Sequence, residues 1–213
     1  MPVARWVIFD MDGTLTDSMA VWDEVPARLL ARFGKTPAPD LRRRLLPLGM
    51  EQTARLMIAE YALPVTGAEF AALAAACVRE GYRQVGLCPG AAQLVRALAG
   101  QGARLCVASA TPEPLCREVL ARLGLLPYFE FVASGQKDTP ALYLACMERL
   151  GAPCPAQTVV FEDAPHAVRT AKAAGFYTVA VAEPHAAADT PQLRALADRY
   201  LLSLAEYLPG VQA

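Results

Sequence analysis

The sequence lacks the features that mark membrane, secreted and disulfide-stapled proteins. None of its apolar runs approaches the about 18 residues that a membrane-spanning helix needs. The short apolar run at residues 6–9 is followed at once by acidic residues, so no signal peptide is visible. The six cysteines include no C-x-x-C pair and have no zinc-like spacing with the two histidines. We therefore expect buried free thiols in a soluble, cytoplasmic protein.

Strong charge of either sign is also missing. The formal net charge is -1, and 54% hydrophobic with 19% charged residues is a globular composition. Arg42-Arg43-Arg44 is the only basic run, and three residues are too few for a nucleic-acid footprint, so we interpret it as a solvated helix face. The composition favours neither nucleic acid nor a membrane surface as a partner, and we expect a monomer or a weak oligomer.

Short apolar runs alternate with helical segments through most of the chain. Strands are predicted at residues 6–9, 105–108, 158–161, 176–181 and, more weakly, 129–132. Helices are predicted between them at residues 91–99, 112–123, 140–150 and 165–174. Continuous apolar strands are what a parallel sheet covered on both faces requires. The sequence therefore predicts an α/β fold with a doubly wound parallel sheet, in which ligands bind at the carboxyl ends of the strands.

Residues 18–85 interrupt this alternation. Apolar residues recur there at helical spacing, an alanine-rich segment follows at 68–82, and no convincing strand is present. Pro89-Gly90 marks the return to the α/β part. We therefore expect an α/β core formed by residues 1–17 and 86–213, with a helical domain at 18–85 inserted after the first strand.

The first predicted strand ends at Asp10-Met11-Asp12-Gly13-Thr14. Two carboxylates two residues apart can face a common site if the backbone turns, and Gly13 permits that turn. One carboxylate can attack an electrophile while the second donates or accepts a proton as a general acid or base. The segment can also be a turn whose aspartates cap a helix. The segment does not match an EF-hand calcium loop, because glycine is at the fourth position instead of the sixth and no glutamate follows at the twelfth.

Residues 9–15, Phe-Asp-Met-Asp-Gly-Thr-Leu, resemble the first motif of the haloacid dehalogenase-like (HAD) hydrolases. The other motifs of that family follow in order. Ser109 ends a hydrophobic strand, as in the second motif, and Lys137 precedes a helix, as in the third. Glu162-Asp163 ends a strand, as in the fourth. The resemblance covers most of residues 7–181.

This resemblance implies a phosphoryl-transfer enzyme with a Mg²⁺ cofactor. Asp10 would attack phosphorus and form an aspartyl-phosphate, and Asp12 would protonate the leaving oxygen and then activate water. The metal would be held by Asp10, the main-chain carbonyl of Asp12 and Asp163, with Glu162 as a further or water-mediated ligand.

The resemblance also implies a phosphate-binding group. Ser109 and the amides around Ala110 would bind the phosphoryl oxygens, and Lys137 would add positive charge against Asp10. Only three lysines occur beside 17 arginines, which hints that a compact ammonium is needed at this position. The third motif departs from the family's usual Gly-Lys-Pro-x-Pro-Asp, because residues 136–141 are Gln-Lys-Asp-Thr-Pro-Ala. Taken singly, Ser109 and Lys137 are also compatible with a strand-end hydroxyl and a surface lysine, and Glu162-Asp163 with acids at a helix N-terminus.

The helical insertion resembles the C1-type cap of the β-phosphoglucomutase-like branch. Such a cap closes over the phosphoryl site, excludes water and supplies substrate contacts. By position, residues 48–52 resemble the cap loop that faces the active site. Glu51 and Gln52 would accept hydrogen bonds from sugar hydroxyls, and Arg44 would meet a second anionic group. Alternatively, residues 50–52 merely begin the next helix.

The leading interpretation is a Mg²⁺-dependent phosphatase for a small phosphorylated metabolite, such as a sugar phosphate. The sequence barely separates it from a phosphomutase that uses the same Asp10 and Asp12. A catalytically silent phosphate-binding regulator is a more remote alternative. Dehalogenation is disfavoured, because that branch lacks the aspartate that Asp12 supplies. Phosphonate cleavage would need a cap lysine, and the insertion offers only Lys35.

Overall fold

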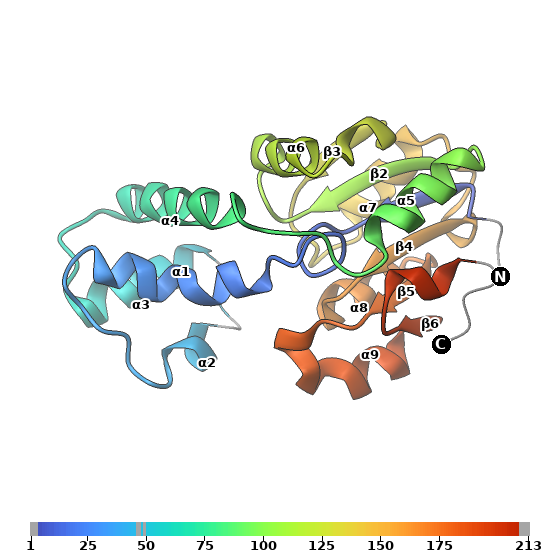
Figure 1. Ribbon diagram of the computed structural model, residues 1–213. Coiled ribbons are helices and arrows are strands. Elements are labelled where there is room, and N and C mark those ends of the chain that lie inside the picture. Colours follow the sequence, from blue (N-terminus) through green and yellow to red (C-terminus); the bar gives the residue numbers. More distant parts are fainter. Residues whose placement is uncertain (1–3, 46–47, 49, 209–213) are drawn as a thin grey trace. The chain divides into compact units, whose positions relative to one another are not determined.

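A computed structural model describes residues 4–45, 48 and 50–208 of the chain (Figure 1). The chain divides into two compact units, one of Met1–Asp17 with Gly86–Ala213 and one of Ser18–Val85. We call them the α/β unit and the helical unit.

The α/β unit contains a six-stranded parallel sheet in the order β3-β2-β1-β4-β5-β6 (Figure 1). The strands are β1 (Trp6–Phe9), β2 (Arg104–Ser109), β3 (Phe131–Ser134), β4 (Thr158–Glu162), β5 (Tyr177–Val181) and β6 (Arg199–Leu201). The helices of this unit are α5 (Ala91–Gly100), α6 (Glu113–Arg122), α7 (Ala141–Arg149), α8 (Pro165–Ala173) and α9 (Thr190–Leu196). The predicted α/β class with a parallel sheet is confirmed.

Both faces of the sheet are covered, which explains the continuous apolar runs. Side chains alternate across a strand, so neighbours in sequence point to opposite faces. Ile8 and Val160 belong to a buried cluster that includes Tyr143 of α7. The adjacent Phe9 and Phe161 stack on each other on the other face, with ring centroids 4.7 Å apart. All five side chains are buried, as a sheet sandwiched between helices requires.

Two strands differ from the sequence prediction. The run predicted at 129–132 was placed two residues too early, because a 3₁₀ turn at Leu126–Tyr128 precedes it and pairing with β2 begins with Phe131 opposite Cys106. The edge strand β6 and the helix α9 before it were not predicted. β6 has only three residues and no apolar run, and it is defined by its pairing with β5.

In the helical unit, all regular elements among the described residues are helices. They are α1 (Met19–Ala31), α2 (Leu41–Leu45), α3 (Met50–Tyr61) and α4 (Gly67–Tyr82). Helix α1 packs on α4 where Gly81 faces Val21, since a Cβ on Gly81 would lie 2.5 Å from Val21 Cγ1. Next to this contact, Trp22 Nε1 donates a hydrogen bond to Tyr82 Oη at 3.0 Å. No helix in the described part of the chain is long and apolar enough to cross a membrane.

Candidate active site

The two aspartates of the first motif lie in a tight turn after β1, in the middle of the sheet. The N–H of Asp10 donates to the carbonyl of Phe161 at 2.9 Å, which extends the pairing of β1 with β4 by one residue. The chain then reverses sharply, because the N–H groups of Leu15 and Thr16 both donate to the carbonyl of Met11, at 2.9 and 2.8 Å. The carboxylate of Asp10 therefore projects from the carboxyl end of a buried strand.

Gly13 is required by this turn for two reasons. Its φ is +80°, a conformation that residues with a Cβ rarely adopt. A Cβ at this position would also lie 2.4 Å from Asp163 Oδ2. The missing side chain is what lets the first-motif turn approach the carboxylate that follows β4.

Lys137 lies in the loop between β3 and α7, and its ammonium contacts two carboxylates. Nζ donates to Asp10 Oδ1 and to Glu162 Oε1, and the lysine is only 6% exposed. Tyr143 Oη donates to the same Glu162 oxygen at 2.9 Å. An ammonium buried between two carboxylates reduces the repulsion that they would otherwise exert on each other. The altered third motif thus still brings its lysine to Asp10.

Glu162 and Asp163 follow each other at the end of β4 but have different surroundings. Glu162 Oε2 accepts the N–H groups of Asp163 and Ala164, at 3.0 and 3.2 Å. Since Lys137 and Tyr143 occupy Oε1, both oxygens of Glu162 already have partners. The geometry suits Glu162 to holding Lys137 in place and suits Asp163 better to direct contact with a cation.

Burial strongly changes the pKa values of the acids in this site. It raises the pKa of Asp10 from 3.8 to about 8, against the opposing charge of Lys137. Burial and the charges of Asp10 and Glu162 raise the pKa of Asp163 well above its ordinary value. Burial alone would lower the pKa of Lys137, but the two carboxylates outweigh it and raise that pKa, so the lysine stays an ammonium. One ammonium does not balance three buried carboxyl groups.

The residues present fit a divalent cation. Ligand oxygens of Asp10, Glu162 and Asp163 lie within 4.8 Å of one another. Asp10 Oδ2 is buried and has no hydrogen-bond partner within the described residues, which is costly for a carboxylate oxygen. A cation would satisfy that oxygen and lower the pKa of the acids around it. The donor set is all oxygen, which is the set that Mg²⁺ prefers.

Asp12 is held by two hydroxyl groups from the end of β2. Ser109 Oγ donates to Asp12 Oδ2 at 3.3 Å, and Thr111 Oγ1 donates to the same oxygen at 2.8 Å. The N–H of Thr111 donates to Ser109 Oγ at 3.0 Å, so the two hydroxyls are fixed relative to each other. Ala110, between them, is exposed. Sequence reasoning missed Thr111, although the Ser-Ala-Thr spacing places a second hydroxyl two residues beyond the strand end.

The residues predicted to contact substrate from the insertion lie in the helical unit. Arg44 Nη1 and Nη2 donate to Glu60 at 2.8 and 2.7 Å, and Glu51 pairs with an arginine one turn away on α3. Such exposed pairs contribute about 0–1 kcal/mol, so they open at small cost. Gln52 is exposed on α3, which residues 50–52 do begin. Gly49, part of the predicted cap loop, lies outside the described residues.

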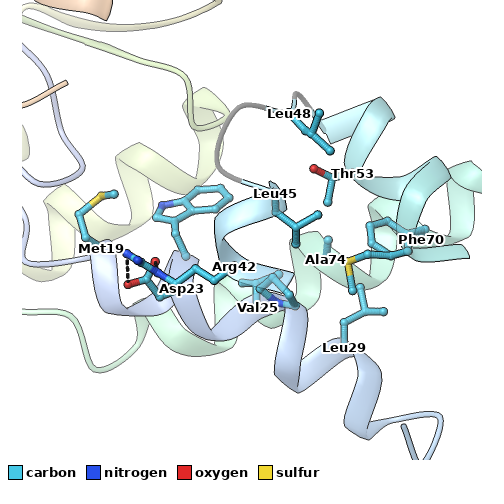
Figure 2. Close-up of a pocket in the computed structure, with 13 residues that line it drawn as sticks. Met19, Asp23, Val25, Leu29, Arg42, Leu45, Leu48, Thr53, Phe70 and Ala74 are labelled. Carbon is cyan, nitrogen blue, oxygen red and sulfur yellow. Dashed lines mark hydrogen bonds and ion pairs between the residues drawn. The ribbon is translucent and has the colours of Figure 1, made fainter. Parts of the chain in front are cut away.

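Figure 2 shows residues that line an apolar pocket within the helical unit. The volume of this pocket is about 330 Å³. Its lining includes Val25, Leu29 and Phe70, from α1 and α4. Arg42 also lines it, but its guanidinium forms two hydrogen bonds to Asp23, at 2.7 and 2.9 Å. Among the described lining residues, Arg42 is the one cation, and its charge is already balanced. The pocket therefore does not have the chemistry of a phosphoryl-binding site.

The geometry of the site and a comparison of the sequence with models of known protein families together identify the family of this chain. The model of the haloacid dehalogenase-like hydrolase family matches residues 4–175, and the chain belongs to that family. It is 29% identical to the "Probable pseudouridine-5'-phosphatase" of Drosophila melanogaster, over 95% of this chain and 90% of that protein. It is 30% identical to hexitol phosphatase B of Escherichia coli, over 93% of this chain and 92% of that protein.

A solved structure agrees with these relatives. The crystal structure of CbbY from Rhodobacter sphaeroides in complex with phosphate has a TM-score of 0.76 and 25% sequence identity to this chain. The match covers 97% of this chain and 96% of that chain. The similarity therefore includes both units of the fold and is not restricted to the motifs around Asp10.

Proposed function

We propose that this protein is a Mg²⁺-dependent phosphatase that acts on a small phosphorylated metabolite through an aspartyl-phosphate on Asp10. The observation that carries the proposal is the arrangement of three charged groups. Asp10 contacts Lys137 and is one of the three clustered acids, while Asp12 is oriented separately by hydroxyl groups. The two curated relatives named above are phosphatases by their printed names, which supports the reaction class.

The proposed reaction has two steps. Asp10 attacks phosphorus, the bond from phosphorus to the ester oxygen breaks, and Asp12 gives a proton to the departing oxygen. Water then attacks phosphorus and passes a proton to Asp12, and the bond from phosphorus to the Asp10 oxygen breaks. Phosphate leaves, the carboxylate of Asp10 is restored, and Asp12 is again protonated. Ser109, Lys137 and the N–H groups around Ala110 bind the phosphoryl oxygens. A bound Mg²⁺ would offset the repulsion between an anionic carboxylate and an anionic phosphate.

The two units have different roles in this proposal. The α/β unit is the catalytic core, and the helical unit is a cap that supplies substrate contacts, with Arg44, Glu51 and Gln52 as the candidates. Hexitol phosphatase B is named for a polyhydroxylated phosphate ester. Phosphorylated sugars and polyols are therefore the first substrate class to screen.

Phosphate release from p-nitrophenyl phosphate with and without Mg²⁺ tests the reaction class. We expect activity that EDTA removes and that Asp10→Asn abolishes. Glu113→Gln, which changes an exposed carboxylate on α6, is the matched control and should keep full activity. Retention of turnover by purified Asp10→Asn would contradict the proposal.

A panel of phosphorylated sugars, nucleotides and hydroxyacids, ranked by kcat/KM, then identifies the substrate. The panel includes β-glucose 1-phosphate with a bisphosphate primer. Its conversion to the 6-phosphate without stoichiometric phosphate release would show a phosphomutase instead of a phosphatase.

A further inference from the structure

A second group of metal-binding side chains lies in the α/β unit, outside the candidate active site. It consists of Asp17, Glu183 and His185, and one ligand atom from each lies within 4.8 Å of the others. Asp17 follows the turn after β1, and its N–H donates to the carbonyl of Gly86 at 3.1 Å. Glu183 and His185 come from the segment that follows β5. None of these three side chains is shared with the candidate active site.

Glu183 provides the observation that points to a ligand. It is only 5% exposed, and its Oε2 is buried with no hydrogen-bond partner anywhere in the described chain. The main-chain N–H groups of His185 and Ala186 hydrogen-bond the carboxylate, so its orientation is set by the backbone. Buried carboxylate oxygens are normally paired, because an unpaired one has lost its hydration without replacement. A cation would supply the missing partner.

The other two side chains leave the site open to solvent, and they combine a carboxylate with an imidazole. Asp17 and His185 are exposed, so water can complete the coordination of a bound ion. Two carboxylates with one imidazole differ from the all-oxygen cluster at Asp10. Imidazole favours Zn²⁺ and related transition metals, whereas Mg²⁺ prefers oxygen ligands alone. The two clusters therefore differ in the cation that each would select.

We propose that Asp17, Glu183 and His185 form a second cation site, which binds a divalent first-row transition metal such as Zn²⁺. Gly13 lies between this site and the first one. A Cβ on Gly13 would lie 2.4 Å from Asp163 Oδ2 and 3.1 Å from Glu183 Cγ. The bound ion ties Asp17, the last residue before the chain enters the helical unit, to the segment after β5. Since the unfolded chain lacks this arrangement, the ion also stabilises the fold.

Zn²⁺ titration of the protein in excess Mg²⁺ tests the site. The protein is first freed of metal by chelation, and Mg²⁺ then occupies the all-oxygen cluster. By calorimetry we expect one further Zn²⁺ per chain. His185→Ala and Glu183→Gln should each weaken Zn²⁺ binding by roughly 10–100-fold or more, since even the loss of an outer-shell partner has an effect of that size. His166→Ala, which changes the chain's other histidine, exposed on α8, should leave Zn²⁺ binding unchanged.

The free cysteines of the chain are the competing ligands for Zn²⁺. Replacing Zn²⁺ by Co²⁺ distinguishes cysteine ligands from the proposed site by absorption spectroscopy. A thiolate ligand produces an intense near-ultraviolet charge-transfer band, whereas the proposed nitrogen and oxygen ligands do not. Asp10→Asn should keep its Zn²⁺ affinity, because Asp10 belongs to the other cluster. The proposal is overturned by any of four results: no Zn²⁺ binding above Mg²⁺, unchanged affinity in His185→Ala, a thiolate band, or loss of the Zn²⁺ site in Asp10→Asn.

Discussion

The ammonium of Lys137 contacts the carboxylate of Asp10, although 127 positions separate these residues in the sequence. They meet because the strands of a parallel sheet end at one edge, and β1 lies near the middle of that edge. The same ammonium also contacts Glu162. A single buried ammonium therefore contacts two of the three buried acids of the site, and a divalent metal would favour the ionised form of the acids around it.

Replacing the ammonium of Lys137 should remove activity and lower stability together. In Lys137→Met the buried Asp10 and Glu162 lose their cation, which costs about 3–5 kcal/mol of unfolding free energy when one partner of a buried pair is removed. We expect kcat to fall by roughly 10²–10³-fold, the range for a lost charge-stabilising donor. Denaturant unfolding and steady-state kinetics measure the two effects.

Lys172→Met is the matched control for this change. Lys172 is partly exposed and contacts Asp198 at the surface, so its loss should cost about 0–1 kcal/mol and leave kcat unchanged. Equal effects of the two substitutions would contradict the assigned role of Lys137.

The hydroxyl of Thr111 should matter for turnover more than for binding. Thr111→Val keeps the shape of the side chain but removes the 2.8 Å hydrogen bond to Asp12 Oδ2. A hydrogen bond to a charged group is worth about 1.5–3 kcal/mol, so we expect kcat to fall by roughly 10–100-fold with little change in KM. Thr111→Ser should recover most of the loss. Thr170→Val, whose hydroxyl donates to a carbonyl on α8, should have no effect on kcat. Equal kcat for Thr111→Val and wild type would remove Thr111 from the proton-transfer machinery.

Mg²⁺ affinity should rise with pH. In the metal-free protein the pKa of Asp10 is raised by burial from 3.8 to about 8, so Asp10 keeps its proton at neutral pH. Mg²⁺ binds the ionised carboxylate and must displace that proton. We therefore expect the dissociation constant for Mg²⁺, measured by calorimetry, to fall as pH rises and to level off above about 8. Asp10→Asn cannot ionise at this position and should weaken the pH dependence, with the remainder coming from Asp163, whose pKa is also raised.

The same shift has a consequence for the stability of the metal-free protein. Between 3.8 and about 8 the unfolded chain has released the Asp10 proton while the folded chain retains it. Fewer protons on the unfolded state means that this group's contribution to unfolding free energy falls as pH rises through this window. Denaturant unfolding in EDTA should show the decline, and saturating Mg²⁺ should reduce it. A Mg²⁺ affinity independent of pH across the same window would contradict both expectations.

Gly13→Ala should disturb the cation site as well as the backbone. The φ of +80° costs about 1–2 kcal/mol for a residue with a Cβ, and that Cβ would also lie 2.4 Å from Asp163 Oδ2. Gly102→Ala is a close control, because Gly102 has φ of +78° but no atom within 4 Å of a Cβ. We expect both variants to lose unfolding free energy and only Gly13→Ala to lose Mg²⁺ affinity. Equal Mg²⁺ affinity in the two variants would show that the turn tolerates a side chain.

Several elements could be predicted from local sequence, and others could not. The strand at residues 6–9 and the helix at 165–173 have strong local signals, an apolar run and a Pro at the first turn, and both were found almost residue for residue. The edge strand β6 has no such signal, because three residues become a strand only when β5 is beside them. Thr111 was missed for a related reason, since its importance depends on Asp12, a residue 99 positions away.

The sequence by itself determined the class of the fold, the order of the strand-end motifs and the candidate residues that they contain. Those features depend on short stretches of chain, in which apolar runs, glycine and acidic residues act locally. Only the tertiary structure decided which candidates meet. The strand order brings the ends of β1 and β4 together and places the loop after β3 at the same edge of the sheet, so that Lys137 contacts Asp10 and Glu162. It also assembles Asp17, Glu183 and His185, which no spacing along the chain connects.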